Sequence, residues 1–425
     1  MSPLATPFLD YERHTLGNGL RVVLHRNAAL PLVAVNLWYH VGSKNERPGR
    51  TGFAHLFEHM LFQGSEHLRT HDHFRYVQQV GGVANGSTWY DRTNYYETVP
   101  AHQLDLALWL ESDRLGFFLP ALTQASFDTQ RDVVMNERRQ RVENQPYGFA
   151  GERIHELLYP DGHPYHWPVI GYMEDIAAAT LEEVRTFFRT YYTPNNAVLT
   201  LVGDFQPAQA LERVEAWFGE IPPGPTVPKV SAPLPPLTGE RRATLPDSVH
   251  LPRVYVGFRS PGYGQRLWYA ADLLAALLAG GKSSPLYREL VYERQIAQDV
   301  GASVGPYESA GTFLMVATAR PGVAVEALEE ALLAAVDRAA AAPPDGDDFE
   351  RARNRMLTDC YSSLQKLDSL ADLFSQFTTY LDDPAGVAAE ADRYLELGAQ
   401  DLMDYAAGWA TEEQRVVVTV VPKQN

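Results

Sequence analysis

The stretch Tyr192-Thr-Pro-Asn-Asn-Ala-Val-Leu-Thr-Leu-Val202 decides the fold, because a related stretch stands 218 residues further along the chain. The second copy reads Ala410-Thr-Glu-Glu-Gln-Arg-Val-Val-Val-Thr-Val420. A helical pattern precedes each copy, over residues 181–191 and over residues 400–409. The same order of segments at one offset indicates that the chain contains two diverged copies of one domain.

The start of each half supports this interpretation. In residues 33–64 and again in residues 253–281, a strand with a turn leads into an apolar helix that ends in glycine. These two segments are displaced by about 217 residues, close to the offset of the first pair. We therefore predict an internal duplication.

A proline-rich segment separates the two halves. Seven prolines fall within residues 222–236, too many for a helix or a central strand: Pro222, Pro223, Pro225, Pro228, Pro233, Pro235 and Pro236. Such a segment is typical of an extended, semi-rigid linker. We expect an N-terminal domain over residues 1–221, the linker over residues 222–239, and a homologous C-terminal domain over residues 240–425.

Within the first half, two strands precede several helices. Residues 20–25 and 33–41 have the β-branched and aromatic composition of strands. The periodicity of four later segments is helical: residues 52–62, 104–118, 127–142 and 181–191. Adjacent strands followed by blocks of helices favour an α+β fold with a mainly antiparallel sheet over a doubly wound parallel sheet.

Composition excludes several classes of protein. A net charge of −17 argues against a nucleic-acid partner, which a basic face would bind. An acidic surface kept for solubility explains this charge more simply than an acidic cavity for basic peptides. The single cysteine, Cys360, excludes an intramolecular disulfide and a cysteine-based metal site. Any metal must therefore be bound by histidines and carboxylates.

The chain gives no sign of a membrane or export segment. Charges or glycines interrupt every long apolar run, so we expect no membrane span. Residues 1–11 lack a basic start and an apolar core, so we expect no signal peptide. This favours a cytoplasmic location, with a periplasmic one as the alternative if a leader has been removed.

The strongest local signal is His55-Leu-Phe-Glu58-His59 within a helical run. Residues four apart lie one above the other on a helix, so His55 and His59 can bind one zinc ion from one face. The Glu58 carboxylate flanks that face, where it can take a proton from a water molecule on the metal. Burying these groups in an otherwise apolar helix without a purpose would be costly.

A catalytic zinc site needs three protein ligands and one open position. The later helical segment carries Asp128, Asp132, Glu137 and Glu143. Glu137 follows an apolar stretch, which can turn its side chain inward. Spacing alone does not choose between Glu137 and Asp132.

Several motifs together resemble the pitrilysin, insulinase and mitochondrial processing peptidase family. They are the pentapeptide, Leu16-Gly-Asn-Gly-Leu-Arg-Val, Gly64, Gly82-Val-Ala-Asn85-Gly-Ser-Thr88, Arg131-Asp-Val-Val-Met-Asn-Glu137, His163-Pro-Tyr and Tyr192-Thr-Pro-Asn-Asn. The resemblance covers essentially the whole chain. It implies two similar αβ domains that face each other around a cavity, with zinc on the first one.

The resemblance also implies roles for individual residues. His55, His59 and Glu137 match the zinc ligands, and Glu58 matches the general base. The family often has an acidic residue seven positions before the third ligand, where this chain has Gln130. An amide can still bond a ligand but brings no charge.

Asn85 and Gly86 fall where the family has a substrate-binding pair on an edge strand. The second residue of that pair is alanine in the family and Gly86 here. An exposed edge would bind an extended peptide by strand addition. An ordinary turn at these two residues is the alternative.

The second half departs from the family pattern. Family members that complete the site carry an Arg and a Tyr that grip the substrate carbonyl, and Tyr292 and Gln298 stand there instead, with Arg294 nearby. At the positions that align with the zinc motif, the second half has Asp272, Ala275 and Ala276. The second half therefore cannot bind zinc by this design.

We therefore expect a zinc endopeptidase that cleaves extended peptides in an enclosed chamber. The resemblance implies a heterodimer in which a homologous partner supplies the Arg and Tyr. The alternatives are a self-sufficient homodimeric peptidase and a non-catalytic structural homologue. A second metal site at His67, His71 and His73 is disfavoured, because their irregular spacing is typical of surface histidines.

Overall fold

The computed structural model describes residues 9–230 and 233–423, and its contacts divide them into two compact units. Unit 1 comprises residues 9–138, 167–230 and 362–389, and unit 2 comprises residues 139–166, 233–361 and 390–423. Residues 231 and 232 of the predicted linker lie outside the described residues, as do residues 1–8 of the segment in which we expect no signal peptide.

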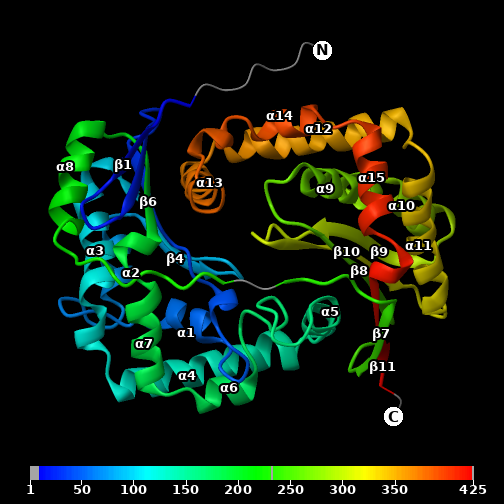
Figure 1. The fold of residues 1–425 in the computed structure, drawn as a ribbon, viewed down its shortest axis with the longest axis horizontal. Helices are drawn as coiled ribbons and strands as arrows, with labels where there is room; N and C mark the ends of the chain where they lie inside the picture. Colours follow the sequence, from blue (N-terminus) through cyan, green and yellow to red (C-terminus); the bar gives the residue numbers. More distant parts are fainter. Residues whose placement is uncertain (1–8, 231–232, 424–425) are drawn as a thin grey trace. The chain divides into compact units, whose positions relative to one another are not determined.

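Unit 1 is built on a six-stranded sheet in the order β1-β2-β6-β3-β5-β4 (Figure 1). Its strands are β1 (Glu12–Thr15), β2 (Arg21–Arg26), β3 (Leu32–Tyr39), β4 (Val83–Thr88), β5 (Thr93–Pro100) and β6 (Ala197–Gly203). The pair β2 and β6 is parallel, and every other neighbouring pair is antiparallel. Strand β4 therefore forms one edge of the sheet.

The central strand β3 is buried on both sides of the sheet. Val35 and Leu37 belong to the core that Phe57 and Leu108 complete on one face. Side chains alternate along a strand, so Trp38 points to the opposite face. There its indole Nε1 donates a hydrogen bond of 2.8 Å to Asp372. The sheet therefore needs a helical layer on each face.

The helices of unit 1 supply these layers. They are α1 (Phe53–Met60), α2 (Asp72–Gln79), α3 (Leu104–Ala121), α4 (Gln124–Arg138), α6 (Met173–Ala178), α7 (Leu181–Tyr191), α8 (Pro207–Phe218) and α13 (Leu367–Tyr380). Helix α13 comes from the far end of the chain and packs on β3 and β6. Figure 1 shows it in orange. The buried Phe374 of α13 contacts His25 of β2, with ring centroids 5.6 Å apart.

Unit 2 repeats this sheet topology. Its strands are β7 (Arg241–Asp247), β8 (Arg253–Pro261), β9 (Ala297–Val304), β10 (Ala310–Ala319) and β11 (Arg415–Pro422), in the order β7-β11-β8-β10-β9. This order and the strand directions match β2-β6-β3-β5-β4 of unit 1, including one parallel pair at the same place. The predicted α+β fold with two similar, mainly antiparallel halves is confirmed.

The helices of unit 2 include one that lies early in the sequence. They are α5 (Ala150–Leu158), α9 (Arg266–Ala279), α10 (Pro285–Tyr287), α11 (Val325–Ala341), α14 (Glu390–Leu395), α15 (Ala399–Trp409) and most of α12 (Gly346–Ser363). Helix α5 packs on β8 and β11, although it precedes the proline-rich segment. Each half of the chain thus gives a helix to the sheet of the other half. The domain boundaries expected from the sequence stay a prediction, and they do not include this exchange.

The predicted elements agree closely with those observed. The helix expected over residues 127–142 is α4, followed by one π-helical segment, Arg139–Glu143. Residues 222–230 and 233–237 contain neither helix nor strand, as expected of an extended linker.

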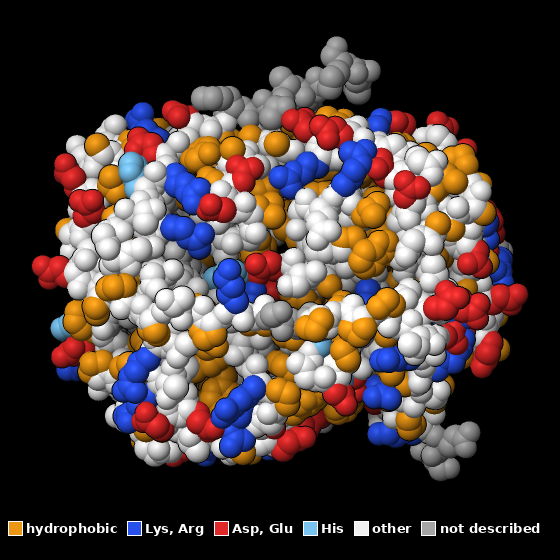
Figure 2. Space-filling model, in the orientation of Figure 1, with side chains coloured by type: hydrophobic (Ala, Val, Ile, Leu, Met, Phe, Trp, Pro, Cys, Tyr) orange, Lys and Arg blue, Asp and Glu red, His pale blue; other side chains and the backbone are white. Residues whose placement is uncertain are grey.

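Two observations concern the expectations that the chain has no nucleic-acid partner and no membrane span. On the face that Figure 2 shows, Lys and Arg side chains stand singly or in small groups among acidic ones, without a continuous basic area. No helix within residues 9–230 and 233–423 is long and apolar enough to span a membrane.

Candidate metal centre

Helix α1 begins at a position that only glycine fits well. Gly52 has a φ of +87°, and a Cβ there would lie 2.7 Å from the Ile170 carbonyl oxygen. Glycine has no side chain with which to cap the helix, and Glu46 caps it instead. The Glu46 carboxylate accepts hydrogen bonds of 2.9 Å from Gly52 N and 2.8 Å from Ala54 N. A carboxylate at this end also interacts favourably with the helix dipole.

Two further hydrogen bonds hold α1 in place. The Thr51 hydroxyl, just before the helix, donates to Asp175 at 2.7 Å. At the other end, the buried Tyr95 hydroxyl of β5 donates to the Phe57 carbonyl at 3.2 Å. The helix is therefore fixed to α6 and to the sheet, which sets the direction of its histidines.

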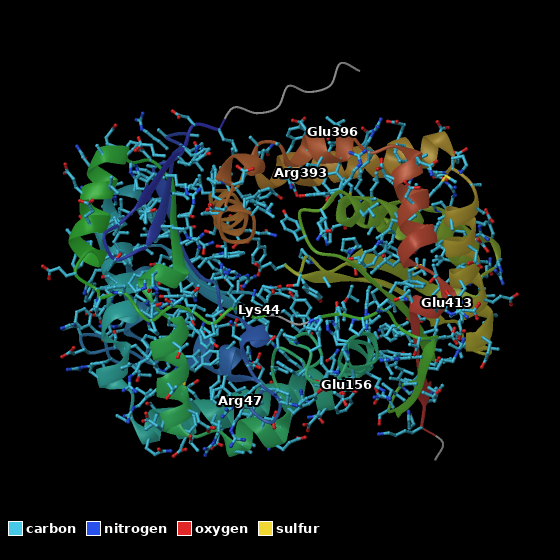
Figure 3. All side chains as sticks on the ribbon, in the orientation of Figure 1. Lys44, Arg47, Glu156, Arg393, Glu396 and Glu413 are labelled. Atoms are coloured by element: carbon cyan, nitrogen blue, oxygen red, sulfur yellow. The ribbon has the colours of Figure 1, made fainter. Side chains whose placement is uncertain are left out.

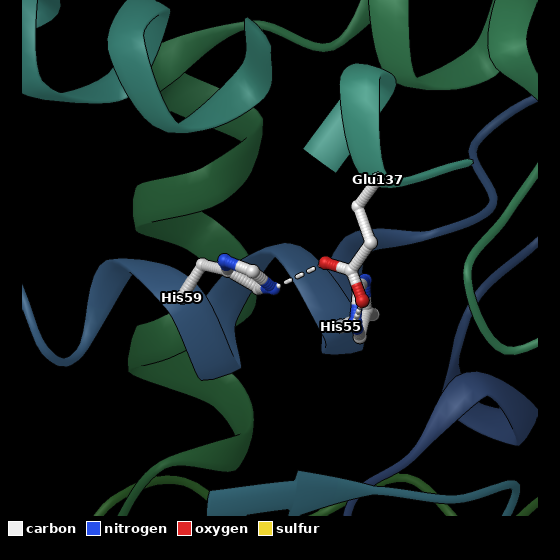
Figure 4. A group of neighbouring side chains, drawn as sticks. All are labelled: His55, His59 and Glu137. Atoms are coloured by element: carbon white, nitrogen blue, oxygen red, sulfur yellow. Dashed lines mark ion pairs between the residues drawn. The ribbon is translucent and has the colours of Figure 1, made fainter. Parts of the chain in front are cut away.

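The structure brings His55, His59 and Glu137 together (Figure 4). One Glu137 carboxylate oxygen lies 2.9 Å from His59 Nε2, and the other lies 3.8 Å from His55 Nε2. One ligand atom from each side chain lies within 4.8 Å of the other two. His55 is only 8% exposed, and Glu137 reaches the histidines from near the end of α4. Asp132, the alternative that spacing left open, is exposed.

This donor set fits a zinc ion. Zinc prefers imidazole nitrogens and carboxylate oxygens at about 2.0–2.1 Å in tetrahedral geometry, which places ligand atoms about 3.3 Å apart. The distances of 2.9 and 3.8 Å lie on either side of this value. Two histidines and one carboxylate also leave a fourth position open, as a catalytic site requires.

Glu58 lies beside this group and is held by Thr88. The Thr88 hydroxyl at the end of β4 donates a hydrogen bond of 2.7 Å to the Glu58 carboxylate. Burial raises the pKa of Glu58 above its usual range, while this hydrogen bond and His59 act in the opposite direction. Thr88 belongs to the segment of residues 82–88 that carried the family resemblance, but the sequence alone gave it no role.

A pocket of about 300 Å³ adjoins Glu58 and His59. Phe62, Phe74, Asn85 and Gln130 also line it. The buried Gln130 thus borders the pocket from α4, on the same helix as Glu137. The pocket is large enough to hold a substrate side chain beside the candidate metal ligands.

Asn85 and Gly86 lie within strand β4, so the turn considered as an alternative is not formed. They pair with Tyr96 and Tyr95 of β5, on the side of β4 that has a neighbour. The Asn85 side chain is exposed, and its Oδ1 accepts a hydrogen bond from Gly86 N at 2.9 Å. The opposite side of β4 has no strand neighbour among the described residues.

The loop that follows β4 is fixed by a buried ion pair. Lys44 Nζ lies 3.1 Å from Asp91 Oδ1, and both side chains are buried (Lys44 is labelled in Figure 3). The backbone N–H of Lys44 also donates to the Tyr90 carbonyl at 2.9 Å. These contacts tie the segment leading into α1 to the β4–β5 loop, so Thr88 and Glu58 keep their relative positions.

The residues singled out in the second half lie in unit 2. Tyr292 is 54% exposed, and Arg294 and Gln298 are exposed as well. The Arg294 guanidinium donates to Glu289 at 3.1 Å. Asp272 of α9 accepts a hydrogen bond of 2.7 Å from the Tyr394 hydroxyl, and burial raises its pKa to about 6.

A second group of potential ligands lies in unit 1 and was not expected. His73 of α2, Glu97 of β5 and Glu111 of α3 offer ligand atoms within 4.8 Å of one another. His73 is only 4% exposed, so the expectation that it is a surface histidine is wrong, whereas His67 and His71 do reach the surface. An Arg114 guanidinium nitrogen lies 2.8 Å from His73 Nδ1 and 2.9 Å from Nε2. Its positive charge takes the place that a metal ion would need.

The structure thus combines two copies of one α+β fold with a candidate zinc site in the first copy. A sequence profile described as insulinase, peptidase family M16, matches residues 21–164. A second profile, described as the peptidase M16 inactive domain, matches residues 178–356. The second matched segment contains none of the four candidate residues His55, Glu58, His59 and Glu137.

Known proteins resemble the whole chain. The zinc protease PqqE of Helicobacter pylori is 30% identical over 97% of this chain and 93% of its own length. A crystal structure of a protease from Helicobacter pylori matches 98% of this chain and 100% of its own, with a TM-score of 0.93 and 30% identity. A probable mitochondrial-processing peptidase subunit beta of Arabidopsis thaliana is 25% identical over 86% of this chain and 70% of its own length. The chain belongs to the pitrilysin and insulinase family, peptidase family M16.

We expect purified wild-type protein to contain one zinc ion per chain, measured by mass spectrometry of the metal. His55→Ala and His59→Ala should lose it, because two remaining ligands do not hold zinc tightly. Glu137→Gln should weaken zinc binding, whereas Asp132→Asn, on the exposed side of the same helix, should leave it unchanged. Full zinc content in either histidine variant would contradict the assignment.

The cluster around Arg114 predicts a pH dependence of stability. Burial and the neighbouring Glu111 raise the pKa of Glu97 well above its usual range. The contribution of Glu97 is therefore fully present below its unfolded pKa of about 4.3, and is lost as pH rises through the folded pKa. Glu97→Gln should unfold at a higher temperature than wild type at alkaline pH, and this advantage should shrink as pH falls.

The measurement is the thermal unfolding temperature of both proteins between weakly acidic and alkaline pH. The control is Glu212→Gln on α8, where the carboxylate is exposed. The difference in unfolding temperature between this variant and wild type should be the same throughout this pH range. Parallel curves for Glu97→Gln and wild type would show that the Glu97 carboxyl does not retain a proton in the folded state.

Proposed function

We propose that this chain is a zinc-dependent endopeptidase that hydrolyses peptides bound in extended conformation. The observation that carries the proposal is the meeting of His55, His59 and Glu137 beside the Glu58 carboxylate. Zinc proteases among the relatives support it, as does the pocket of about 300 Å³ next to Glu58. In the proposal, His55, His59 and Glu137 are the zinc ligands.

Glu58 and its hydrogen-bond partner Thr88 each have a part in the proposed reaction. A bound zinc ion would lower the pKa of a water molecule and polarise the scissile carbonyl. Glu58 accepts a proton from the attacking water and returns it to the leaving amine. Burial, which raises the pKa of Glu58, favours the protonated form that the second transfer requires. Thr88 holds one carboxylate oxygen, so the other is directed towards the reactants.

The substrate backbone is proposed to pair with β4. This strand lies at the edge of the sheet. Its residue Asn85 lines the pocket, and Gly86 is the next residue along the strand. Main-chain hydrogen bonds along an edge strand give affinity with little demand on sequence. A Cβ at Gly86 would lie 3.2 Å from both Phe62 and Tyr95, so glycine lets this strand pack closely on the two rings.

The proposed active form is a heterodimer with a homologous partner chain. A peptidase needs hydrogen-bond donors for the oxyanion in addition to the metal. Tyr292 and Gln298 stand where the family resemblance places an Arg and a Tyr, and neither carries a positive charge. A homodimer that uses Arg294 is the second candidate, because that guanidinium is exposed and close in sequence.

Glu58→Gln should keep zinc and lose hydrolysis, because the ligands remain while the general base is removed. We expect kcat/KM on an internally quenched peptide to fall by about a hundred- to ten-thousand-fold. The same samples are analysed for metal. Loss of zinc together with activity would make Glu58 a ligand, and unchanged activity would exclude it as the base.

Adding a homologous chain that carries the Arg and Tyr should raise the peptidase rate of this chain by about a hundred- to a thousand-fold, the usual effect of one oxyanion donor. The assay compares this chain alone, the partner alone, and their mixture. A partner whose Arg is changed to Ala serves as the control. High turnover by the lone chain, unchanged by the partner, would favour the self-sufficient enzyme.

A further inference from the structure

We propose that a polar pocket on the other side of β4 is a substrate subsite that binds the cationic side chain of a lysine or arginine. The inference rests on the proposed function, since it requires an extended peptide beside β4. It adds the chemical class of one substrate side chain, and it assigns a role to helix α13.

Successive side chains of β4 point to opposite faces of the sheet, and this pocket lies on the face opposite the metal centre. Thr88 points to Glu58. The preceding residue, Ser87, points to the other face of the sheet, where its hydroxyl donates to Asn94 at 2.7 Å. Side chains of a peptide paired with β4 alternate in the same way. If one of them enters the metal-side pocket, the next one along the peptide lies beside Ser87.

The pocket next to Ser87 has a volume of about 180 Å³ and is lined by residues with polar or charged side chains. The sheet contributes Asn36, Ser87, Arg92, Asn94 and Tyr96. The first turns of α13 contribute Asp368, Ser369 and Asp372. All of these residues belong to unit 1. The pocket thus adjoins the edge strand on one side and carries two carboxylates on the other.

Hydrogen bonds hold the Asp372 carboxylate in one orientation. Its Oδ1 accepts from Trp38 Nε1 at 2.8 Å, from Asn94 Nδ2 at 3.1 Å and from Asn36 Nδ2 at 3.2 Å. Among the described residues, the structure gives no hydrogen bond to Oδ2. An anchored carboxylate with one oxygen still available is a pre-organised acceptor for an ammonium or guanidinium group.

The charges at the pocket favour a cation. Asp368 is exposed and forms no ion pair among the described residues, and Asp372 forms none either. Arg92 is the cation in the lining, and its Nη1 already donates to the Ser87 carbonyl at 2.8 Å and to Asn94 Oδ1 at 3.1 Å. The formal charge of the lining is therefore −1, with Lys366 at the start of α13 outside the lining.

An anionic side chain fits less well. The N-terminal end of α13 would attract an anion through its dipole. Asp368 already occupies that first turn, and its Oδ1 accepts a hydrogen bond of 2.8 Å from Ser369 N. A lysine or arginine can instead lay its aliphatic stem across Ser87 and place its charged end between the two carboxylates.

The experiment moves a lysine through each position of one extended peptide and compares it with norleucine, which has a similar stem without the ammonium group. Glutamate at each position is the third peptide set. We measure kcat/KM for wild type, Asp368→Asn, and the double variant Asp368→Asn/Asp372→Asn. Asn at 372 can still accept the three hydrogen bonds, and Asp368→Asn alone changes only an exposed group. Glu212→Gln on α8 is the matched control for charge.

Lysine at one position should raise kcat/KM about tenfold over norleucine in wild type and in the control, the usual effect of a hydrogen-bonded charge pair. The single variant should reduce this preference and the double variant should abolish it. Cleavage of the norleucine peptide should stay unchanged in Asp368→Asn, and in the double variant the ratio of lysine to norleucine cleavage, rather than the absolute rate, is the measured quantity. No lysine preference at any position, a preference that survives the double variant, or a preference for glutamate would each overturn the proposal.

A binding measurement separates this proposal from the proposed function. Fluorescence anisotropy reports binding of the same labelled peptides to zinc-loaded Glu58→Gln protein, with and without the two Asp→Asn changes. Lysine-dependent binding that the changes abolish, without any hydrolysis by wild type either alone or with the homologous partner, would support the subsite and contradict the peptidase. Hydrolysis without lysine-dependent binding would support the peptidase and overturn the subsite. Absence of both binding and hydrolysis would overturn both.

Discussion

The packing of α13 on the first sheet is the interaction on which the rest of unit 1 depends. Strand β3 is buried on both faces, and only one face is covered by helices that are near it in sequence. A two-sided sheet without its second layer would expose apolar side chains and leave the Trp38 indole without its acceptor. Because Asp372 accepts hydrogen bonds from both β3 and β5, the same contact also fixes the hairpin that carries β4.

The fixed position of β4 then determines how Glu58 is held at the candidate metal centre. Thr88 is the last residue of that strand and the hydrogen-bond donor to Glu58. The Lys44–Asp91 ion pair fixes the loop beyond it, and Tyr95 of the next strand holds α1 through the Phe57 carbonyl. A general base is effective only when it is held within hydrogen-bond reach of the reactants. A helix from the far end of the chain therefore helps to position a carboxylate in the N-terminal half.

Local patterns explain which parts of this structure the sequence predicts. The duplication, the strand and helix ranges, and the pairing of His55 with His59 depend on neighbours in sequence or on repetition, and both can be read without coordinates. Glu137 needed the family resemblance, because a helix with several acidic residues presents more than one of them at similar spacing. The structure excludes Asp132 as the third ligand, because this residue lies on the exposed side of α4.

The remaining contacts follow from tertiary packing, which no local pattern contains. The Asn36–Asp372 hydrogen bond joins residues 336 positions apart, and the Thr88–Glu58 bond joins residues 30 positions apart. His73 lies in an irregular series with His67 and His71, so spacing favours the surface for all of them. Its burial depends on Arg114 of α3, whose charge also offsets the buried carboxylates beside it.

The second copy shows that the fold does not require the metal site. Asp272 of α9 stands where the alignment of the halves places His55, and it is partly buried in a helix that follows a central strand. A buried carboxyl must be hydrogen-bonded or lose its charge, and Asp272 does both in part. The Tyr394 hydroxyl bonds it, and burial raises its pKa to about 6. One polar position in the fold thus has different partners in the two copies, Glu137 from another helix in the first copy and a tyrosine hydroxyl in the second. The order of the five strands β7-β11-β8-β10-β9 matches that of β2-β6-β3-β5-β4, so this architecture does not depend on the histidine motif.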